Sequence, residues 1–321
     1  MSLNNSAASG TSLAGLALAA GLLSSCGGGT QVEVYVPTRL IVLGDENSVI
    51  NLDGRKYTVN ATVSATDAAL DCKANPIWVQ VLATAYGFVF LQCNPAAAPV
   101  TAAMYAIPGA KVASIPAQAA QAGALSRGDL VTVLAGANDI LDQYARFPGV
   151  GEDQLSAELE SAGAALAAQV NAIADAGGRV LIATVPDMGL TPFAIAEKAL
   201  AGNAGADRAA LLSRLTGRFN AKLRANIVND GRRIGLLLTD ELVQTIVKFP
   251  ASLAYVNVTQ AACAAGTTLP DCSNATLQPA SGTVAAAGPF TWLWADAVHL
   301  SPGGHGRLGG LAAARAAGNP F

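Results

Sequence analysis

Short apolar runs alternate with long amphipathic stretches along most of the chain. Three stretches have helical periodicity, at residues 116–125, 151–178 and 205–230, and Gly177–Gly178 ends the second of them. Four apolar runs are continuous rather than alternating, which is typical of strands buried on both faces of a parallel sheet. These runs are Arg39–Asp45, Leu130–Leu134, Val180–Val185 and Ile234–Thr239. Strands separated by long helices predict an α/β fold with a mostly parallel sheet covered by helices on both faces.

A polar residue follows each of the four predicted strands. These residues are Asp45, Asn138, Asp187 and Asp240. In open α/β sheets the functional site lies beyond the carboxyl ends of the strands. The sequence therefore predicts that the site lies at this edge of the sheet.

The composition narrows the possible partners. The chain has 321 residues, of which 52% are hydrophobic and 13% charged, and its formal net charge is −3. No stretch rich in Lys and Arg occurs, so we expect neither nucleic acid nor an anionic membrane surface as a partner. No internal repeat or linker follows residue 38, and we expect a single domain over residues 39–321.

The N-terminus has the pattern of an export signal. Ser12–Leu23 is an apolar run of the length found in signal peptides, and the following "LSSCGGGT" resembles a bacterial lipobox. This pattern predicts a lipoprotein-type signal peptide at 1–25, a lipid anchor at Cys26 and a tether over 26–38. Gly27 after the cysteine resembles lipoproteins sent to the outer membrane, so we expect an exported bacterial lipoprotein on the outer membrane or the periplasmic face. The segment before the apolar run lacks Lys and Arg, and the alternative is an ordinary signal peptide cleaved elsewhere.

Four cysteines remain after Cys26, in two pairs of near neighbours: Cys72 with Cys93, and Cys263 with Cys272. An even number of cysteines in an exported chain predicts two disulfides, most simply within these pairs. Three connectivities are possible, and four buried thiols are the alternative. No Cys-x-x-Cys motif occurs, which makes zinc or redox chemistry unexpected.

The chain has only two histidines, His299 and His305, so a histidine acting as general base must be one of them. Asp296 precedes His299 by three positions, a spacing that lets its carboxylate orient the imidazole. A surface aspartate beside a loop histidine is the simpler explanation of this pattern alone. Two histidines without further clustered ligands do not form a metal site, and we expect no metal and no cofactor.

Two further stretches contain groups suited to stabilise an oxyanion. In "LAGANDIL", Asn138 follows a strand and a glycine, and its amide N–H is such a donor. In "MYAIPGAKV", the backbone N–H of Gly109 at a sharp turn is another. Taken singly, Asn138 is explained by a helix cap and Gly109 by an ordinary Pro-Gly turn.

Together these blocks resemble the GDSL or SGNH hydrolase family, in order, over about residues 39–315. The matching residues are Gly44–Asp45, Gly109, Gly136–Asp139 and Asp296–His299. The resemblance implies a flavodoxin-like three-layer α/β/α sandwich, and a Ser nucleophile served by His299 and Asp296. It also implies an oxyanion hole that includes Gly109 and Asn138. The implied reaction is hydrolysis of carboxylic esters, so the implied partner is a small-molecule or lipid ester: a lipid, a short acyl ester or an acetylated sugar.

The chain departs from the family at the nucleophile. In direct register the family's serine falls on Glu46, whose charge opposes formation of an oxyanion. Ser48 reaches the nucleophile position only if the turn after Asp45 is longer by two residues; otherwise it caps the next segment. Two hypotheses follow: a serine esterase using Ser48, His299 and Asp296, or an impaired, ligand-binding relative with Glu46 in the nucleophile slot. A third, with Asp45 and Glu46 as a carboxylate pair that activates water, has only their adjacency in its favour.

Overall fold

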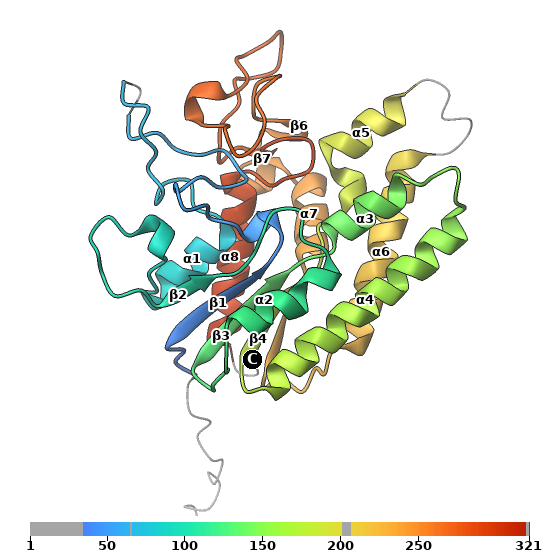
Figure 1. The fold of residues 1–321 in the computed structure, drawn as a ribbon. Coiled ribbons are helices and arrows are strands. Elements are labelled where there is room, and N and C mark those ends of the chain that lie inside the picture. Colours follow the sequence, from blue (N-terminus) through green and yellow to red (C-terminus); the bar gives the residue numbers. More distant parts are fainter. Residues whose placement is uncertain (1–34, 65, 201–206, 319–320) are drawn as a thin grey trace, which may run out of the picture. The chain divides into compact units, whose positions relative to one another are not determined.

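A five-stranded sheet forms the centre of the molecule, and all its strand pairings are parallel (Figure 1). The strand order is β2-β1-β3-β4-β5, which is the order of flavodoxin-like doubly wound sheets. The strands are β1 (Arg39–Gly44), β2 (Ala102–Met104), β3 (Asp129–Leu134), β4 (Arg179–Ala183) and β5 (Ile234–Leu237). The flavodoxin-like fold expected from the sequence is therefore confirmed.

The structure is a computed structural model, and it describes residues 35–64, 66–200, 207–318 and 321. From Tyr35 onwards the chain forms one compact unit. The predicted signal peptide at 1–25, the lipid anchor at Cys26 and most of the tether lie outside the described residues. Within the described part, no helix is both long and apolar enough to cross a membrane.

Successive residues of the strands point to opposite faces of the sheet, which divides the core into two layers. On β1, Ile41 and Leu43 belong to one hydrophobic cluster, and Leu40 and Val42 belong to the other. All four side chains are at most 1% exposed. Both faces of the sheet are therefore covered, which explains why the strands read as continuous apolar runs.

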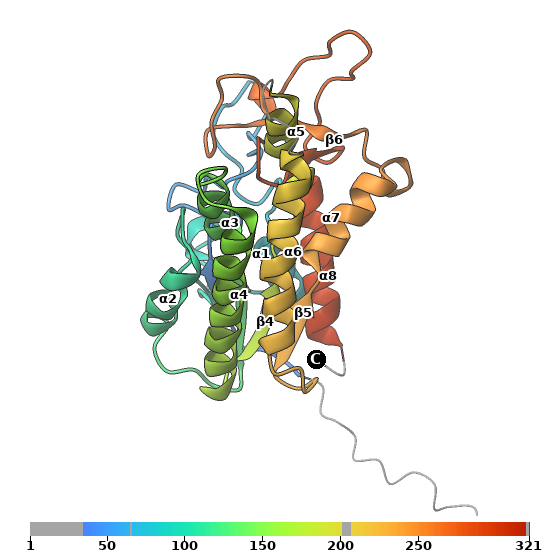
Figure 2. The same cartoon turned by 90° about the vertical axis from the view of Figure 1, so that its right-hand side faces the viewer.

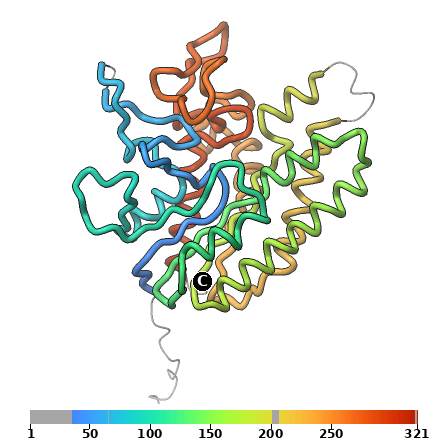
Figure 3. The backbone as a smooth tube through the Cα atoms, viewed as in Figure 1, coloured from blue at the N-terminus to red at the C-terminus, as the bar shows by residue number. Residues whose placement is uncertain are grey.

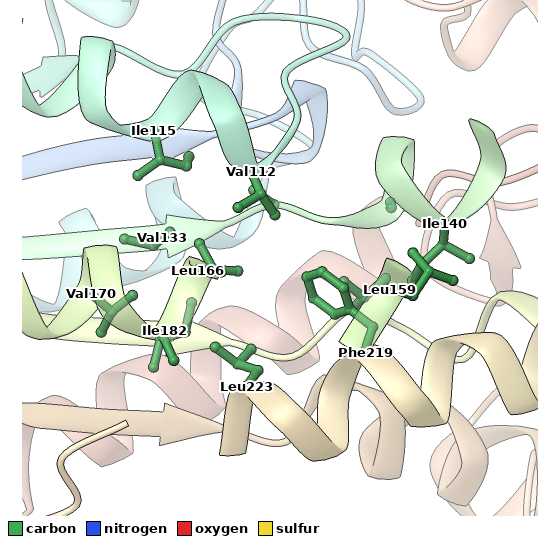
Figure 4. Packing of buried hydrophobic residues seen from close by; sticks show 14 of the residues in the cluster. Val112, Ile115, Val133, Ile140, Leu159, Leu166, Val170, Ile182, Phe219 and Leu223 are labelled. Carbon is green, nitrogen blue, oxygen red and sulfur yellow. The ribbon is translucent and has the colours of Figure 1, made fainter. Parts of the chain in front are cut away.

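The helices cover the two faces in two groups, which lie on opposite sides of the sheet in Figures 1 and 2. Helices α2, α4 and α6 pack on the first face; Figure 4 shows part of this core, where Leu166, Phe219 and Leu223 lie in the same cluster as the strand residues Val133 and Ile182. Helices α1 and α8 pack on the second face. The helices are α1 (Trp78–Tyr86), α2 (Ile115–Gln121), α3 (Ala137–Tyr144), α4 (Glu152–Asp175), α5 (Pro192–Ala199), α6 (Arg208–Asn226), α7 (Thr239–Lys248) and α8 (Pro302–Ala317).

Long loops gather beyond the carboxyl ends of the sheet strands. The backbone trace shows the loop after β1 and the segment between α7 and α8 together at this end of the molecule (Figure 3). A small two-stranded sheet, β6 (Asn257–Ala261) with β7 (Trp292–Trp294), orders the second of these segments. Disulfides join Cys72 to Cys93 and Cys263 to Cys272, which is the simplest of the three possible pairings and the one expected from the sequence.

The structure corrects the boundaries of several predicted elements. β4 ends at Ala183 and β5 at Leu237, so the strands stop before the polar residues that the sequence had included with them. The two long helices appear where they were expected and are shorter at both ends. The short strand β2 and the strands of the small sheet were not predicted: β2 and β7 have only three residues each, and β6 is largely polar with no buried residue.

Candidate active site

The site begins at the carboxyl end of β1, where the backbone of Gly44 packs closely against that of Leu134. Gly44 has φ = +135°, and a side chain there would place its Cβ 2.1 Å from the carbonyl oxygen of Leu134. Gln118 of α2 holds the same residue from the side: its Oε1 accepts from Gly44 N at 2.7 Å, and its Nε2 donates to Gly44 O at 2.9 Å. Only glycine fits this position, and the chain leaves the strand in a fixed direction.

A single 3₁₀ turn, η1 (Glu46–Ser48), follows Asp45. The Asp45 carboxylate caps the turn by accepting from the backbone N–H and the side-chain amide of Asn47, both at 3.0 Å. Glu46 is the first residue of the turn, and its side chain is 11% exposed. The turn therefore presents Glu46, in direct register with the family's serine, to the groups beyond the sheet.

Three groups converge on the carboxylate of Glu46. The backbone N–H of Gly109 donates to Oε2 at 2.8 Å, and the side-chain amide of Asn138 lies 3.1 Å from Oε2 and 3.2 Å from Oε1. On the other side, His299 Nε2 lies 3.3 Å from Oε1. The two groups that the sequence predicted as oxyanion donors thus both bind the Glu46 carboxylate.

Local backbone geometry aims these donors. Gly109 has φ = +72°, which directs its N–H into the site. Asn138 lies in the first turn of α3, after Gly136 with φ = +122°, where a Cβ would meet the ring of Phe219 at 2.4 Å. Asp139, next in the helix, accepts from the backbone N–H of Val112 at 3.0 Å and so links α3 to the Gly109 loop.

His299 lies between two carboxylates. Its Nδ1 is 2.9 Å from both oxygens of Asp296, and Asp296 Oδ1 also accepts from the backbone N–H of His299 at 2.8 Å. The Asp296–His299 pairing expected from the sequence is present in the structure. The pair orients the imidazole so that its second nitrogen faces Glu46.

This arrangement sets the charges of the site. Burial opposes protonation of His299, but the carboxylates of Asp296 and Glu46 outweigh it and raise the pKa of the imidazole to about 10. Burial acts to raise the pKa of Glu46, yet the hydrogen bonds from His299 and from the Gly109 N–H outweigh it and hold that pKa below its usual value. At neutral pH the site therefore contains an imidazolium between two carboxylates.

A cleft of about 530 Å³ opens over Glu46 and His299. One wall is the segment 263–269, which the Cys263–Cys272 disulfide closes into a loop. The cleft is also lined by Tyr57, whose ring centroid is 6.3 Å from that of His299. The cleft gives an outside molecule access to the edge of the Glu46 carboxylate.

Ser48 does not lie in this site. Two residues along a 3₁₀ turn correspond to about 240° around its axis, so Ser48 points away from the position of Glu46. Its side chain is fully buried, and the indole Nε1 of Trp78 donates to its Oγ at 3.1 Å. The structure contains no longer turn after Asp45, and this geometry is against Ser48 as the nucleophile.

Of the four polar residues expected at the edge of the sheet, only Asn138 reaches the site. Asp45 is fully buried and is not part of the cleft, so Asp45 and Glu46 do not form a pair facing a common water. Asp187 accepts from Gly189 N and from Ser213 Oγ. Asp240 has several partners, all of them within the fold: Thr184, Asn220 and Arg224, whose Nη2 donates to both carboxylate oxygens. Among the residues described, no three His, Cys, Asp or Glu side chains are grouped as metal ligands would be.

Two residues that shape the cleft were not identified from the sequence. Tyr57 lies in a loop with no periodic pattern. Asn60 joins that loop to the opposite wall: its side-chain amide donates to Pro270 O at 2.8 Å and its backbone N–H to Cys272 O at 2.9 Å. Contacts between segments so distant in the chain leave no local signal in the sequence.

A parallel doubly wound sheet with an Asp–His pair and two oxyanion-type donors at its carboxyl edge defines an SGNH-type hydrolase architecture. The model of the GDSL-like lipase/acylhydrolase family matches residues 64–310, a range that includes Gly109, Asn138, Asp296 and His299 and begins after Glu46. The chain belongs to this family, which consists of carboxylic ester hydrolases.

Solved structures of esterases and lipases also match the chain. The acetylxylan esterase Axe2 from Geobacillus stearothermophilus is 14% identical, with a TM-score of 0.42 over 90% of this chain and 99% of that one. The lipase Lip_vut3 from a goat rumen metagenome is 14% identical, with a TM-score of 0.46 over 86% and 97%. An extracellular lipase from Streptomyces rimosus is 17% identical, with a TM-score of 0.42 over 87% and 99%. A comparison with curated protein sequences finds no match.

Proposed function

We propose that this protein is an exported carboxylic ester hydrolase in which Glu46 takes the place of the family's serine. The observation that carries the proposal is the convergence of Gly109 N–H, the Asn138 amide and His299 Nε2 on one carboxylate. These are the groups that an ester hydrolase needs around its reacting carbon: two oxyanion donors and an imidazole held by a carboxylate.

The reaction that these groups support has two steps. A Glu46 carboxylate oxygen attacks the ester carbonyl carbon, and the alcohol leaves with the proton of His299 Nε2, giving an acyl anhydride on Glu46. His299, now neutral, takes a proton from water, which attacks the acyl carbon and releases the carboxylic acid. Glu46 and the imidazolium are thereby restored. Asp296 holds the imidazole throughout, and Gly109 N–H and Asn138 stabilise the oxyanion after the carboxylate has rotated away from them.

This chemistry sets limits on rate and substrate. Glu46 has a lowered pKa, so its carboxylate is a weak nucleophile. Its remaining negative charge also opposes the developing oxyanion. We therefore expect slow turnover, fastest with esters of short acyl groups and good leaving groups such as phenols.

The proposed location is outside the cytoplasm, with a lipid at Cys26 as the membrane anchor. Two disulfides in the fold support an oxidising compartment, because such bonds are rare in reducing ones. Radiolabelled palmitate incorporation into the full-length chain expressed in bacteria, compared with Cys26→Ala, tests the anchor. Equal labelling of the two chains would contradict it.

Hydrolysis of p-nitrophenyl acetate and butyrate by residues 30–321 tests the proposed reaction. We expect measurable activity that falls by about 10²-fold or more in Glu46→Gln and in His299→Ala, the range typical of losing a reacting group. Ser48→Ala is the matched control and should keep the parent rate. Loss of activity in Ser48→Ala, with Glu46→Gln unaffected, would overturn the proposal.

A second candidate function is ligand binding without turnover. The observation in its favour is that Glu46 itself occupies the two oxyanion donors, so an ester carbonyl finds them already taken. In this case the wild-type chain is inactive, whereas Glu46→Ser gains hydrolysis of p-nitrophenyl acetate that requires His299.

A further inference from the structure

The Glu46 side chain has the same length as a serine that carries an acyl group. In an acyl-serine, Cβ is followed by Oγ, by the acyl carbon and by its carbonyl oxygen. In glutamate, Cβ is followed by Cγ, by the carboxyl carbon and by Oε. From the same backbone position, a glutamate therefore places its carboxyl carbon where the serine ester would place its acyl carbon.

The contacts of the two oxygens agree with this correspondence. Oε2 lies 2.8 Å from Gly109 N and 3.1 Å from Asn138 Nδ2, as expected for the carbonyl oxygen of an acyl group in an oxyanion hole. Oε1 lies 3.3 Å from His299 Nε2, where the histidine of an acyl-enzyme would direct a water molecule. A hydroxyl at Glu46 Cβ would reach neither donor, since it ends two bonds earlier.

We infer that the side chain of Glu46 fills the part of this site that would hold the acyl group of a substrate. It competes there with small monocarboxylates and acyl groups. The inference rests on the proposed identity of the site as an ester site, and it holds whether or not Glu46 turns substrate over. The carboxylate is well suited to the position: it is 11% exposed, has two neutral donors and faces an imidazolium. A carboxylate from solution can bind there only after the Glu46 carboxylate has moved out of this position.

Removing the side chain leaves a site of defined chemistry. Gly109 N–H, the Asn138 amide and the His299 imidazolium remain in position, because none of them depends on Glu46 for its backbone geometry. Asp139 holds the Gly109 loop, and Asp296 holds His299. The vacated volume is that of a short carboxylic acid, so acetate is the appropriate probe. In the wild-type chain the remaining cleft, lined by Tyr57 and by Thr267 and Thr268, is left for the alcohol part of a ligand.

The test is titration of acetate into folded Glu46→Ala and wild-type domains, followed by the NMR signals of the two histidines and by calorimetry. We expect Glu46→Ala to bind acetate with a Kd at least about 10-fold below that of the wild type, with a shift of the His299 signal. Asn138→Ala in the Glu46→Ala background should weaken this binding again. Glu46→Gln, which keeps the side chain in place, should bind acetate no better than the wild type.

Equal acetate binding by the wild type and Glu46→Ala, or none by a folded Glu46→Ala, would overturn the inference. If Glu46→Ala fails to fold, Glu46→Ser serves as the second variant, because its hydroxyl also leaves the two donors empty. The readout is binding rather than turnover. If the wild type is inactive but Glu46→Ala binds acetate, only the proposed hydrolysis is refuted. If the wild type is active but Glu46→Ala does not bind acetate, only the inference that Glu46 fills the acyl part of the site is refuted.

Discussion

Two regions of the molecule each combine a histidine with a residue of the turn after β1, and they differ in almost every other respect. At the cleft, Glu46 faces His299, which Asp296 supports. Behind it, in the core, Trp78 donates from its indole to Ser48 Oγ at 3.1 Å and from its backbone N–H to His305 Nδ1 at 3.4 Å. The side chains of this second region are fully buried.

The difference between the regions is one of charge. Carboxylates flank His299 and raise its pKa to about 10, whereas burial without a carboxylate lowers the pKa of His305 to about 3. Ser48 in the second region has only neutral partners and no access to solvent. The comparison shows that neither a hydroxyl nor a histidine near the end of β1 is enough to make a site: the carboxylate partners and the cleft distinguish the two regions.

The largest expected effect is the separation of the two histidine titrations, which NMR resolves easily because the chain has only two histidines. At pH 7 we expect His299 to be protonated and His305 to be neutral. His299 should lose its proton only as the pH approaches 10. Glu46→Gln removes one of the two carboxylates and should lower the His299 pKa by about 1 to 3 units, without moving that of His305. Two histidines that both titrate near 6.5 would contradict the charge difference.

The next effect concerns stability. Trp78 is fully buried and is the residue that joins Ser48 to His305. We expect Trp78→Ala to lower the free energy of unfolding by about 3 to 5 kcal/mol, as for other large aromatic side chains in cores. Urea denaturation measures the change. Tyr57→Ala, at the partly exposed cleft, is the control and should cost far less; an equal cost would mean that the cleft region is packed as tightly as the core.

The smallest effect is that of Ser48→Ala. It removes one hydrogen bond and leaves the Trp78 indole N–H without its partner, at a cost of about 1 to 3 kcal/mol in the free energy of unfolding. Hydrolysis by the folded domain should stay unchanged. A fall in activity without a fall in stability would mean that Ser48 does take part in hydrolysis.

The sequence predicted the sheet and the Asp296–His299 pair because their signals are local. Four apolar runs mark β1, β3, β4 and β5, and a spacing of three residues is enough for Asp296 to reach the imidazole. The order of the blocks placed Gly109 and Asn138 at one point of the structure. Local patterns sufficed wherever the determining contacts lie within one turn or one strand.

The sequence did not predict which oxygen faces His299. That choice depends on the length of one turn, which in turn depends on the Asp45 cap and on the clamp of Gln118 on Gly44. It also could not show that Asp187 and Asp240 are used within the fold, since their partners lie on distant helices. Position at the end of a strand indicates where a site lies, but the partners of each polar group decide whether it belongs to the site.

The loop between Cys263 and Cys272 has a consequence for protein engineering. Its residues 264–269 line one wall of the cleft, while both ends are fixed by the cystine and none of these residues contributes a hydrogen bond to Glu46 or His299. A combinatorial library over 264–269 would therefore change the shape offered to a ligand and leave the charged centre as it is. The loop 264–269 can therefore be varied while Glu46, His299 and their partners are kept, which suits the selection of new binding preferences from a single scaffold.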